Sequence, residues 1–402
     1  MNCRICGSGC TPVFNLGYQP ISNEYYDPRS NNEVHYPLEM FFCNSCKFIQ
    51  IDEVVKATDI FVESYPYASS MSDSWLKHCS DYTDYMIERF GLRSGDYVME
   101  IASNDGYLLK FFNSRGLKVK GVEPAGGVAK IAIANGIDTD IEFFNTEYAN
   151  RKSGGVSPKV IVANNVIAHN PNVDDFAHGI GIMMGYETVF TVEFPHLYQL
   201  IKQYQFDIIY HEHYSYFSLK AIMTLLEKNG MTVFDVQELP THGGSLRVFA
   251  KNSGSKAHEV NYDNIKAVLD KEMEAKLYDM ETYEQFFKDI QKIKFSTVSF
   301  LIEQKRLGKR VVAYGAPAKG NTFLNYCGIR DDLIEYTVDR SEFKVGKVLP
   351  GSRIPISNPS RIMVDTPDYI FILPWNIKKE IMGLFNLSEC KFVTAIPELN
   401  VT

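Results

Sequence analysis

Residues 210–219 read YHEHYSYFSL, and this stretch concentrates groups that can move protons. It contains His211, Glu212 and His213 together with three tyrosines, and apolar segments flank it. Histidine titrates near neutral pH, so a histidine oriented by a carboxylate is suited to act as a general base. The stretch therefore indicates acid–base chemistry, and its surroundings must tell which reaction is served.

The local backbone must be irregular for these groups to converge. In a strand, Tyr210 and Glu212 would share one face and His213 would point away, so we expect a loop or bulge here. His211 is more often a structural residue in such a position. The spacing differs from the helical H-E-x-x-H of metalloproteases, so we do not expect a catalytic metal.

Two Cys-x-x-Cys pairs lie near the start of the chain. CRIC spans Cys3 and Cys6, CNSC spans Cys43 and Cys46, and 36 residues separate the pairs. Four thiolates favour a closed tetrahedral Zn²⁺ site, which has no open position for catalysis. We predict a structural zinc module with an insertion that loops out between the pairs. Redox-active or simply buried cysteines are the alternative.

Composition limits the remaining possibilities. The chain has 402 residues, of which 45% are hydrophobic and 22% charged, so two or three globular domains are expected. The net charge of −8 and the pI of about 5.7 argue against nucleic acid or anionic lipid as partners. We find no transmembrane-length apolar run and no secretion signal, so we expect no membrane partner and a cytoplasmic location.

Residues 95–137 carry the pattern of a strand–helix–strand unit. YVMEIA at 97–102 predicts a buried strand, SNDG at 103–106 a turn, and KVKGVEP at 118–124 a second strand ending at Glu123. The first turn lacks the G-x-G-x-x-G of a dinucleotide site, and its acidic groups would repel a pyrophosphate.

A cationic ligand without phosphates would tolerate these acids. Glu123 can accept the hydroxyls of a ribose, as an acidic residue does in NAD sites. Adenosine, a sulfonium and an amino-acid tail would fit, which describes S-adenosylmethionine. A turn with solvated acids is the alternative.

The alternation of strands and helices continues after this unit. Residues 158–180 read as strand, polar turn and helix, with His169 near the end of the strand. Residues 185–201 supply another strand, with Glu193 and His196 at its end. Residues 233–250 resemble a hairpin with His242 and Arg247 near its turn.

A second Rossmann-like unit is predicted in the last third. Residues 294–307 have helical apolar spacing, and RVVAYGAPAKGN at 310–321 gives a strand, a turn and a helix start. Gly315, Ala316 and Lys319 could cradle a phosphate, although an ordinary turn explains the same residues.

A methyl donor constrains the role of the histidine-rich stretch. Oxygen and nitrogen nucleophiles need little help, whereas a carbon nucleophile must first lose a proton, usually beside a carbonyl. The resulting enolate needs hydrogen-bond donors. His213 as the base, with Tyr210, Glu212 and His169 around it, matches that requirement.

Long motifs in order carry a family resemblance over nearly the whole chain. They are CRIC…CNSC, EIASNDGYLL, GVEPA, NNVIAHNPNVDDF, YHEHYSYFSL, HGGSLRVF and YGAPAKGNTFLNYCGI. The chain resembles the three-part sugar C-methyltransferases that act on nucleotide-linked 4-keto deoxysugars. One departure is Ala102, where the turn more often has glycine, and we expect a negative φ there.

The resemblance implies an α/β fold with three parts. Residues 1–60 would form the zinc-binding module, 61–250 a Rossmann-like S-adenosylmethionine methyltransferase domain, and 251–402 a second Rossmann-like domain that holds the nucleotide diphosphate of the sugar. The expected substrate is a nucleotide-diphosphate ketosugar methylated next to the C4′ ketone, at C3′. A monomer is expected.

The resemblance also assigns residues to each role. The expected catalytic residues are His213, Glu212, Tyr210, His169 and Tyr67, with Tyr65 a weaker choice than Tyr67. The expected cofactor-binding residues are Glu100, Ala102, Asn104, Asp105, Leu108, Glu123, Pro124, Asn164 and Asn165. The expected substrate-binding residues are His242, Arg247, Gly315, Ala316 and Lys319. The expected zinc ligands are Cys3, Cys6, Cys43 and Cys46.

Two other functions remain open from the sequence. The same scaffold could methylate oxygen on a sugar or a phosphate-derived group. Alternatively, the zinc module could be an adaptor on an inactive methyltransferase scaffold, although the acidic pI argues against nucleic acid as its partner.

Overall fold

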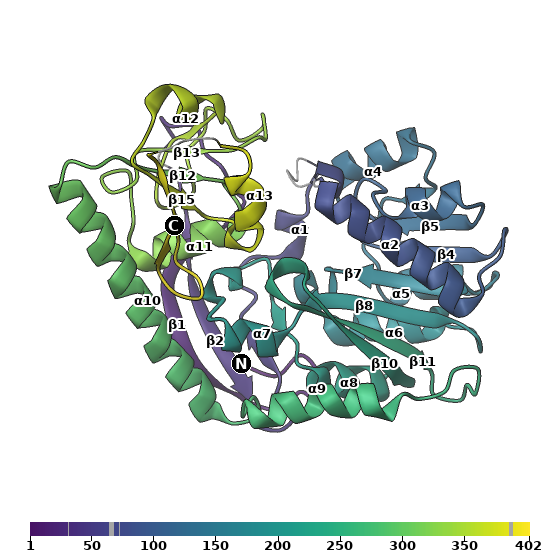
Figure 1. Ribbon diagram of the computed structural model, residues 1–402. Helices are drawn as coiled ribbons and strands as arrows, with labels where there is room; N and C mark the ends of the chain where they lie inside the picture. Colours follow the sequence, from purple (N-terminus) through teal and green to yellow (C-terminus); the bar gives the residue numbers. More distant parts are fainter. Residues whose placement is uncertain (31, 64–67, 72, 386–388) are drawn as a thin grey trace.

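The structure is a computed structural model that describes residues 1–30, 32–63, 68–71, 73–385 and 389–402. Within those ranges it contains three sheets, and helices cover the two larger ones (Figure 1). Among the described residues, no helix combines the length and apolar character needed to cross a lipid bilayer. The predicted α/β class with three parts is confirmed.

The first sheet joins the N-terminal segment to the histidine-rich stretch. Its order is β1-β2-β3-β9, with antiparallel pairs throughout. Its strands are β1 (Cys10–Pro20), β2 (His35–Cys43), β3 (Ile49–Ile51) and β9 (Ser215–Tyr216). The prediction that the insertion between the cysteine pairs loops out is therefore wrong in part, because its residues up to Pro20 belong to β1. Helix α1 (Ala57–Ile60) follows.

The second sheet has seven strands in the order β10-β11-β8-β7-β4-β5-β6. Its parallel strands are β4 (Tyr97–Ile101), β5 (Lys118–Val122), β6 (Thr139–Asp140), β7 (Val160–Asn164) and β8 (Val189–Pro195). The antiparallel hairpin β10 (Met231–Leu239) and β11 (Ser245–Asn252) extends the sheet beside β8, as the hairpin pattern predicted. Every residue of β7 is buried, which explains its uninterrupted apolar run.

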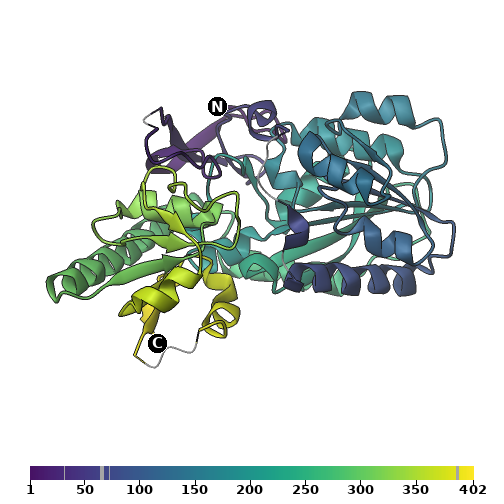
Figure 2. The same cartoon turned by 90° about the horizontal axis from the view of Figure 1, so that it is seen from above.

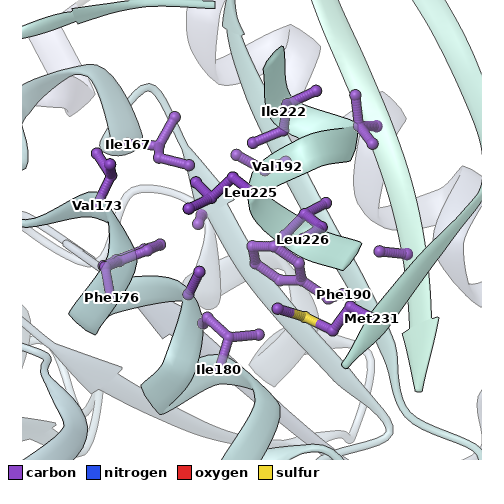
Figure 3. Packing of buried hydrophobic residues seen from close by; sticks show 14 of the residues in the cluster. Ile167, Val173, Phe176, Ile180, Phe190, Val192, Ile222, Leu225, Leu226 and Met231 are labelled. Atoms are coloured by element: carbon purple, nitrogen blue, oxygen red, sulfur yellow. The ribbon is translucent and has the colours of Figure 1, made fainter. Parts of the chain in front are cut away.

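Helices cover both faces of this sheet. One face carries α2 (Asp73–Phe90), α3 (Leu109–Ser114) and α4 (Gly126–Ala134). The other carries α5 (Thr146–Lys152), α6 (Val173–Met183), α8 (Leu219–Lys228) and α9 (Tyr262–Glu274). Figure 3 shows Phe176 of α6, Leu226 of α8 and Phe190 of β8 among the side chains of one buried cluster, with Leu226 beside the ring of Phe190. Ser218 caps α8, since its Oγ accepts the N–H of Ala221 at 3.1 Å.

The third sheet forms the C-terminal part, in the order β14-β13-β12-β15-β16-β17. Its strands are β12 (Val311–Tyr314), β13 (Thr337–Val338), β14 (Ile356–Ser357), β15 (Tyr369–Ile372), β16 (Lys391–Thr394) and β17 (Asn400–Val401). All its pairs are parallel except that of β16 with β17. Its helices are α10 (Met280–Arg306), α11 (Ala318–Cys327), α12 (Ser360–Asp365) and α13 (Lys378–Met382).

The N-terminal part packs against both larger parts. In Figure 2 it lies above the C-terminal part and reaches the central part. The long helix α10 runs beside β1, where Phe14 stacks on Phe287 with ring centroids 5.6 Å apart. On the other side, Phe48 packs against Phe217 at 5.1 Å. Short helix α7 (Leu197–Lys202) follows β8 and contributes Leu197 and Leu200 to the same core as Phe14.

Candidate active site

A cavity of about 910 Å³ lies where the carboxyl ends of the central strands face the C-terminal part. Its lining comes from all three parts of the chain: Asn23 from the N-terminal part, Glu123 and His213 from the central part, and Lys319 and Lys344 from the C-terminal part. The carboxyl edge of a parallel sheet is the usual ligand-binding edge. One enclosed space can therefore hold two ligands side by side.

One end of the cavity is built around the turn after β4. The carboxylate of Glu123, at the end of β5, accepts the N–H of Asn104 at 2.9 Å and the N–H of Ala125 at 2.7 Å. A carboxylate has about four acceptor positions, so each oxygen keeps capacity for a ligand hydroxyl. Burial raises the pKa of Glu123. Glu123 also lines the cavity, and its role in holding a ribose stays a prediction.

The backbone of this turn differs from the expectation at Ala102. Its φ is +55°, not negative, and Asn104 and Gly106 have φ values of +49° and +79°. The chain thus makes a left-handed turn with an alanine at a conformation that favours glycine. Ala102 still lines the cavity, so the strained turn remains compatible with an open site.

Buried polar atoms at this end point to a ligand. Among the described residues, Oδ1 of Asn164 and both side-chain polar atoms of Asn165 lack a hydrogen-bond partner. Buried polar groups in proteins are almost always paired. A ligand with hydroxyl, ammonium and ring-nitrogen groups would satisfy them, and S-adenosylmethionine has all three. Pro124, Asn164 and Asn165 line the cavity as predicted.

Three predicted cofactor residues lie behind the cavity wall. Glu100 and Leu108 are fully buried, Asp105 is nearly so, and the wall of the cavity is made by other residues. Burial raises the pKa of Glu100 well above the ordinary glutamate value. The predicted direct contacts of Glu100 and Leu108 are therefore wrong, because both side chains point into the packed interior. Asp105 accepts the N–H of Ser70 at 3.3 Å.

The histidine-rich stretch forms a tight turn between the short helix Phe206–Ile208 and β9, as its spacing predicted. The N–H of His213 donates to the carbonyl of Tyr210 at 2.8 Å, which closes the turn. The ring of His213 lies 2.9 Å by Nδ1 from the carbonyl of Ile208, and 3.0 Å by Nε2 from the hydroxyl of Tyr210. A carbonyl only accepts, so Nδ1 carries the proton and Nε2 is the basic nitrogen.

The environment of His213 keeps the ring neutral. Burial lowers the pKa of His213 well below the ordinary histidine value, and repulsion from a charge on His169 lowers it further. The two rings meet edge to face with centroids 4.5 Å apart. Burial likewise lowers the pKa of His169 to about 4. Both rings are thus uncharged at neutral pH.

Glu212 makes a different contact from the one expected. Its two carboxylate oxygens accept hydrogen bonds from Nδ2 of Asn23 at 2.8 and 2.9 Å. The hydrogen bonds that orient the His213 ring come from Ile208 and Tyr210, whereas the sequence assigned part of that role to Glu212. His211 donates to the carbonyl of Pro37 at 3.1 Å, in line with a structural role.

The other end of the cavity contains Lys319 and His242. Lys319 donates to Oδ1 of Asn376 at 2.6 Å and lies 5.1 Å from the ring of Trp375. Burial lowers the pKa of Lys319, and the charge of Asp207 opposes this. His242 lies in the hairpin turn with a φ of +53°. Burial lowers its pKa to about 4.

Three predicted substrate residues are placed elsewhere. Arg247 is buried in β11, where it pairs with Glu193 at 2.8 Å. Its guanidinium covers the ring of Tyr82 at 4.4 Å, so this residue stabilises the interior. Gly315 and Ala316 lie beside the cavity rather than in its wall. The N–H of Ala316 donates to Asp339 at 2.7 Å, which removes a donor expected for phosphate.

Some site residues could not be assessed or were missed. Tyr67 and Tyr65 lie outside the described residues. Asn23, Lys344 and Trp75 line the cavity but were not predicted. Asn23 and Lys344 have no local motif.

The four predicted cysteines converge on one point. Their sulfurs all lie within 4.8 Å of one another, with Cys3 and Cys46 at 3.4 Å and Cys6 and Cys43 at 3.4 Å. Sulfurs at the corners of a Zn²⁺ tetrahedron lie about 3.8 Å apart, so the set fits zinc. Gly7 and Lys47, with φ of +74° and +64°, turn the chain after each pair.

Cys10 lies beside this set without joining it. Burial raises the pKa of Cys10 to about 12, so its sulfur stays protonated, unlike a zinc ligand. Cys10 is not among the four predicted zinc ligands, which agrees with this geometry.

Three family models match the chain in sequence. A zinc-binding domain matches residues 3–61, a methyltransferase domain residues 75–236, and a C-methyltransferase C-terminal domain residues 240–397. The C-methyltransferase NovU of Streptomyces niveus is 32% identical over 407 residues, which span 99% of this chain and 96% of that protein.

Solved structures match less than half of the chain at low sequence identity. An S-adenosylmethionine-dependent methyltransferase from Clostridium acetobutylicum ATCC 824 has 11% identity and a TM-score of 0.35, covering 44% of this chain and 92% of its own. The magnesium protoporphyrin IX methyltransferase of Synechocystis PCC 6803 with bound SAM has 13% identity and a TM-score of 0.34, covering 44% and 81%.

Proposed function

Because the chain belongs to the family of S-adenosylmethionine-dependent C-methyltransferases with a zinc-binding domain, we propose that it methylates a carbon beside the C4′ ketone of a nucleotide-linked deoxysugar. The expected position is C3′. The observation that carries this proposal is that the neutral His213 lines the same cavity as Glu123 of the central part and Lys319 of the C-terminal part.

Methylation of carbon requires a base, and His213 has the properties of one. The Ile208 carbonyl accepts the N–H of Nδ1, which fixes the tautomer with the proton on Nδ1. Nε2 is therefore unprotonated, and its lone pair can accept a proton. Nε2 would accept the proton from the carbon beside the ketone. In the resting state the hydroxyl of Tyr210 lies 3.0 Å from Nε2, and it would turn to the substrate when Nε2 takes the proton.

The oxygen of the enolate needs hydrogen-bond donors. We assign Tyr210 to this oxygen, where its hydrogen bond strengthens as negative charge develops. His169 is neutral because its pKa is about 4, and its single N–H faces the backbone carbonyl of Glu212. Its Nδ1 is buried without a partner among the described residues, so this nitrogen would accept a hydrogen bond from a hydroxyl of the substrate, such as that of a ketone hydrate.

S-adenosylmethionine, when bound, supplies the electrophilic methyl group. Glu123 would hold its ribose, and Asn104, Asn164 and Asn165 the remaining polar groups. These side chains lie at or just after the ends of strands β4, β5 and β7 of the central sheet, whereas Lys319 belongs to α11 of the C-terminal part. The carbon acid would sit between the methyl donor and the lysine.

The diphosphate of the sugar nucleotide requires positive charge. Lys319 and Lys344 are the lysines that line the C-terminal side of the cavity. Burial lowers the pKa of each, and a bound dianion would restore the charged form.

Solvent exchange tests the proposal directly. In D₂O and without S-adenosylmethionine, the wild type should exchange the proton beside the ketone of a TDP-linked 4-keto deoxysugar for deuterium. The loss of this proton signal is monitored by NMR. His213→Ala should slow this exchange about 10²- to 10⁴-fold. His178→Ala, which removes an exposed histidine of α6, should leave it unchanged.

Each outcome has a distinct meaning. Exchange that persists in His213→Ala would remove His213 from the base role. If the wild type shows no exchange and its product carries the new methyl group on oxygen, the enzyme is a sugar O-methyltransferase and the proposal is wrong.

A further inference from the structure

The contact between Asn23 and Glu212 joins residues 189 positions apart. Both line the cavity, and Asn23 belongs to the segment between β1 and β2, within the zinc-binding part. Glu212 is 1% exposed, and a buried carboxylate is stable only when hydrogen-bonded or paired. Resting on the function proposed above, we propose that Asn23 is a positioning residue that keeps Glu212 ionised and oriented in the cavity that it shares with His213 during proton abstraction.

The side-chain chemistry fixes the direction of this contact. An ionised carboxylate only accepts hydrogen bonds, so the amide nitrogen of Asn23 must face it. That single nitrogen lies 2.8 and 2.9 Å from the two oxygens. The amide oxygen faces the opposite way, 3.5 Å from the hydroxyl of Tyr25.

The segment that carries Asn23 is anchored on the C-terminal part. The carbonyl of Ser22 accepts Nδ2 of Asn321 at 2.6 Å, and the hydroxyl of Tyr25 donates to the carbonyl of Ala316 at 2.5 Å. Lys344 donates to the same carbonyl at 2.8 Å. Asn23 is therefore held from both sides, and it connects the catalytic turn to the loop after β12.

An ionised Glu212 would assist the base without touching it. When Nε2 of His213 accepts a proton, the ring becomes a cation in a buried site. A neighbouring anion favours that cation. A protonated Glu212 would lose this effect, and Asn23 opposes protonation by donating to the charged form.

Other groups face Glu212 as well. Tyr25 comes from the same segment as Asn23, Tyr214 from the catalytic turn, and Lys344 from the C-terminal part. His169 is contacted by the backbone of Glu212. Lys344 is the one cation in this set, and it remains in place when Asn23 is changed.

The pH dependence of α-proton exchange separates positioning from simple support. Asn23→Ala should raise the pH at which Glu212 takes up a proton. The ratio of the exchange rate in Asn23→Ala to that in the wild type should therefore be about tenfold lower at pH 6 than at pH 8.5. Asn23→Asp keeps the shape of the side chain but places a second carboxylate beside Glu212. The pH below which the exchange rate falls should therefore move higher still. Asn44→Ala removes an exposed amide of the same part and should match the wild type.

The controls distinguish the possible failures. Zinc content and S-adenosylmethionine affinity by calorimetry should stay unchanged in all three variants. A uniform loss at every pH in both Asn23 variants would overturn the positioning role and leave only a structural one. If the wild type itself shows no exchange, the proposed function fails before the role of Asn23 is reached.

Discussion

At the scale of single residues, the protonation state of His213 is set by burial rather than by a carboxylate. The Ile208 carbonyl fixes the tautomer, and desolvation holds the ring neutral. The sequence predicted His213, Tyr210, Glu212 and His169 as one group, and the cavity brings all four together. It could not predict Asn23, since no local pattern connects residues so far apart in the chain.

The lowered pKa of His213 leads to a prediction for activity against pH. A base works when deprotonated, so activity should rise with pH through the folded pKa and then level off. Since that pKa is depressed, the plateau of kcat/KM should already be reached below pH 6.5, the ordinary histidine value. A pH profile with saturating S-adenosylmethionine measures this. An acidic limb centred at or above pH 6.5 would contradict the neutral ring.

Arg247 illustrates why residue type alone misleads. An arginine beside a glycine-rich turn looks like a ligand for phosphate. In β11, however, side chains alternate between the two faces of the sheet, and Arg247 falls on the face occupied by Glu193 and Tyr82. Its role depends on register, which the motif does not contain.

At the scale of elements, hydrophobic periodicity predicted most of the central and C-terminal strands and helices. The runs at 97–101 and 160–164 are strands, and the spacing at 294–307 belongs to α10. β1 was missed because residues 15–20 contain glycine, proline and polar residues typical of loops. Pairing with β2 and packing against α10 overrode that local tendency.

The turn after β4 leads to a prediction for stability. Ala102 has a φ of +55°, which costs about 1–2 kcal/mol for a residue with a Cβ. Glycine would relieve this but lose about 0.5–1 kcal/mol in chain entropy. Ala102→Gly should therefore raise the free energy of unfolding by about 0.5–1 kcal/mol, measured by urea denaturation.

A neighbouring position provides the opposite control. Gly106 has a φ of +79°, and a Cβ there would lie 3.0 Å from Cγ1 of Ile137. Gly106→Ala should destabilise the protein. Equal effects of the two substitutions would show that backbone conformation does not govern this turn.

At the scale of the whole molecule, the zinc-binding part is not a separate appendage. Cys43, Cys46 and Phe48 belong to the same buried core as Phe217 and Leu219 of the central part. Arg4, between the first two cysteines, donates to the carbonyl of Ile51 at 2.6 Å and to the carbonyl of Tyr214 at 3.1 Å. The metal site thus supports the residue next to His213.

Loss of zinc should therefore affect the entire protein. Cys43→Ser should abolish zinc binding, measured by atomic absorption, and lower the Tm by about 5 °C or more because the shared core loosens. Cys10→Ser is the matched control, since Cys10 lies outside the ligand set, and it should keep both zinc and Tm. A Cys43→Ser protein with unchanged melting would show that the zinc site and the central core are independent.

Strand β9 belongs to a sheet whose other three strands come from residues 10–51. Its pairing with β3 joins Ile49 to Tyr216 and Gln50 to Ser215. A hybrid enzyme that exchanged only the central part between two relatives would therefore separate β9 from the partner it evolved with. Without a matching β3, the edge at Ser215 would be left open to other chains. Recombination that preserves activity should carry the first fifty residues and the catalytic turn together from the same parent.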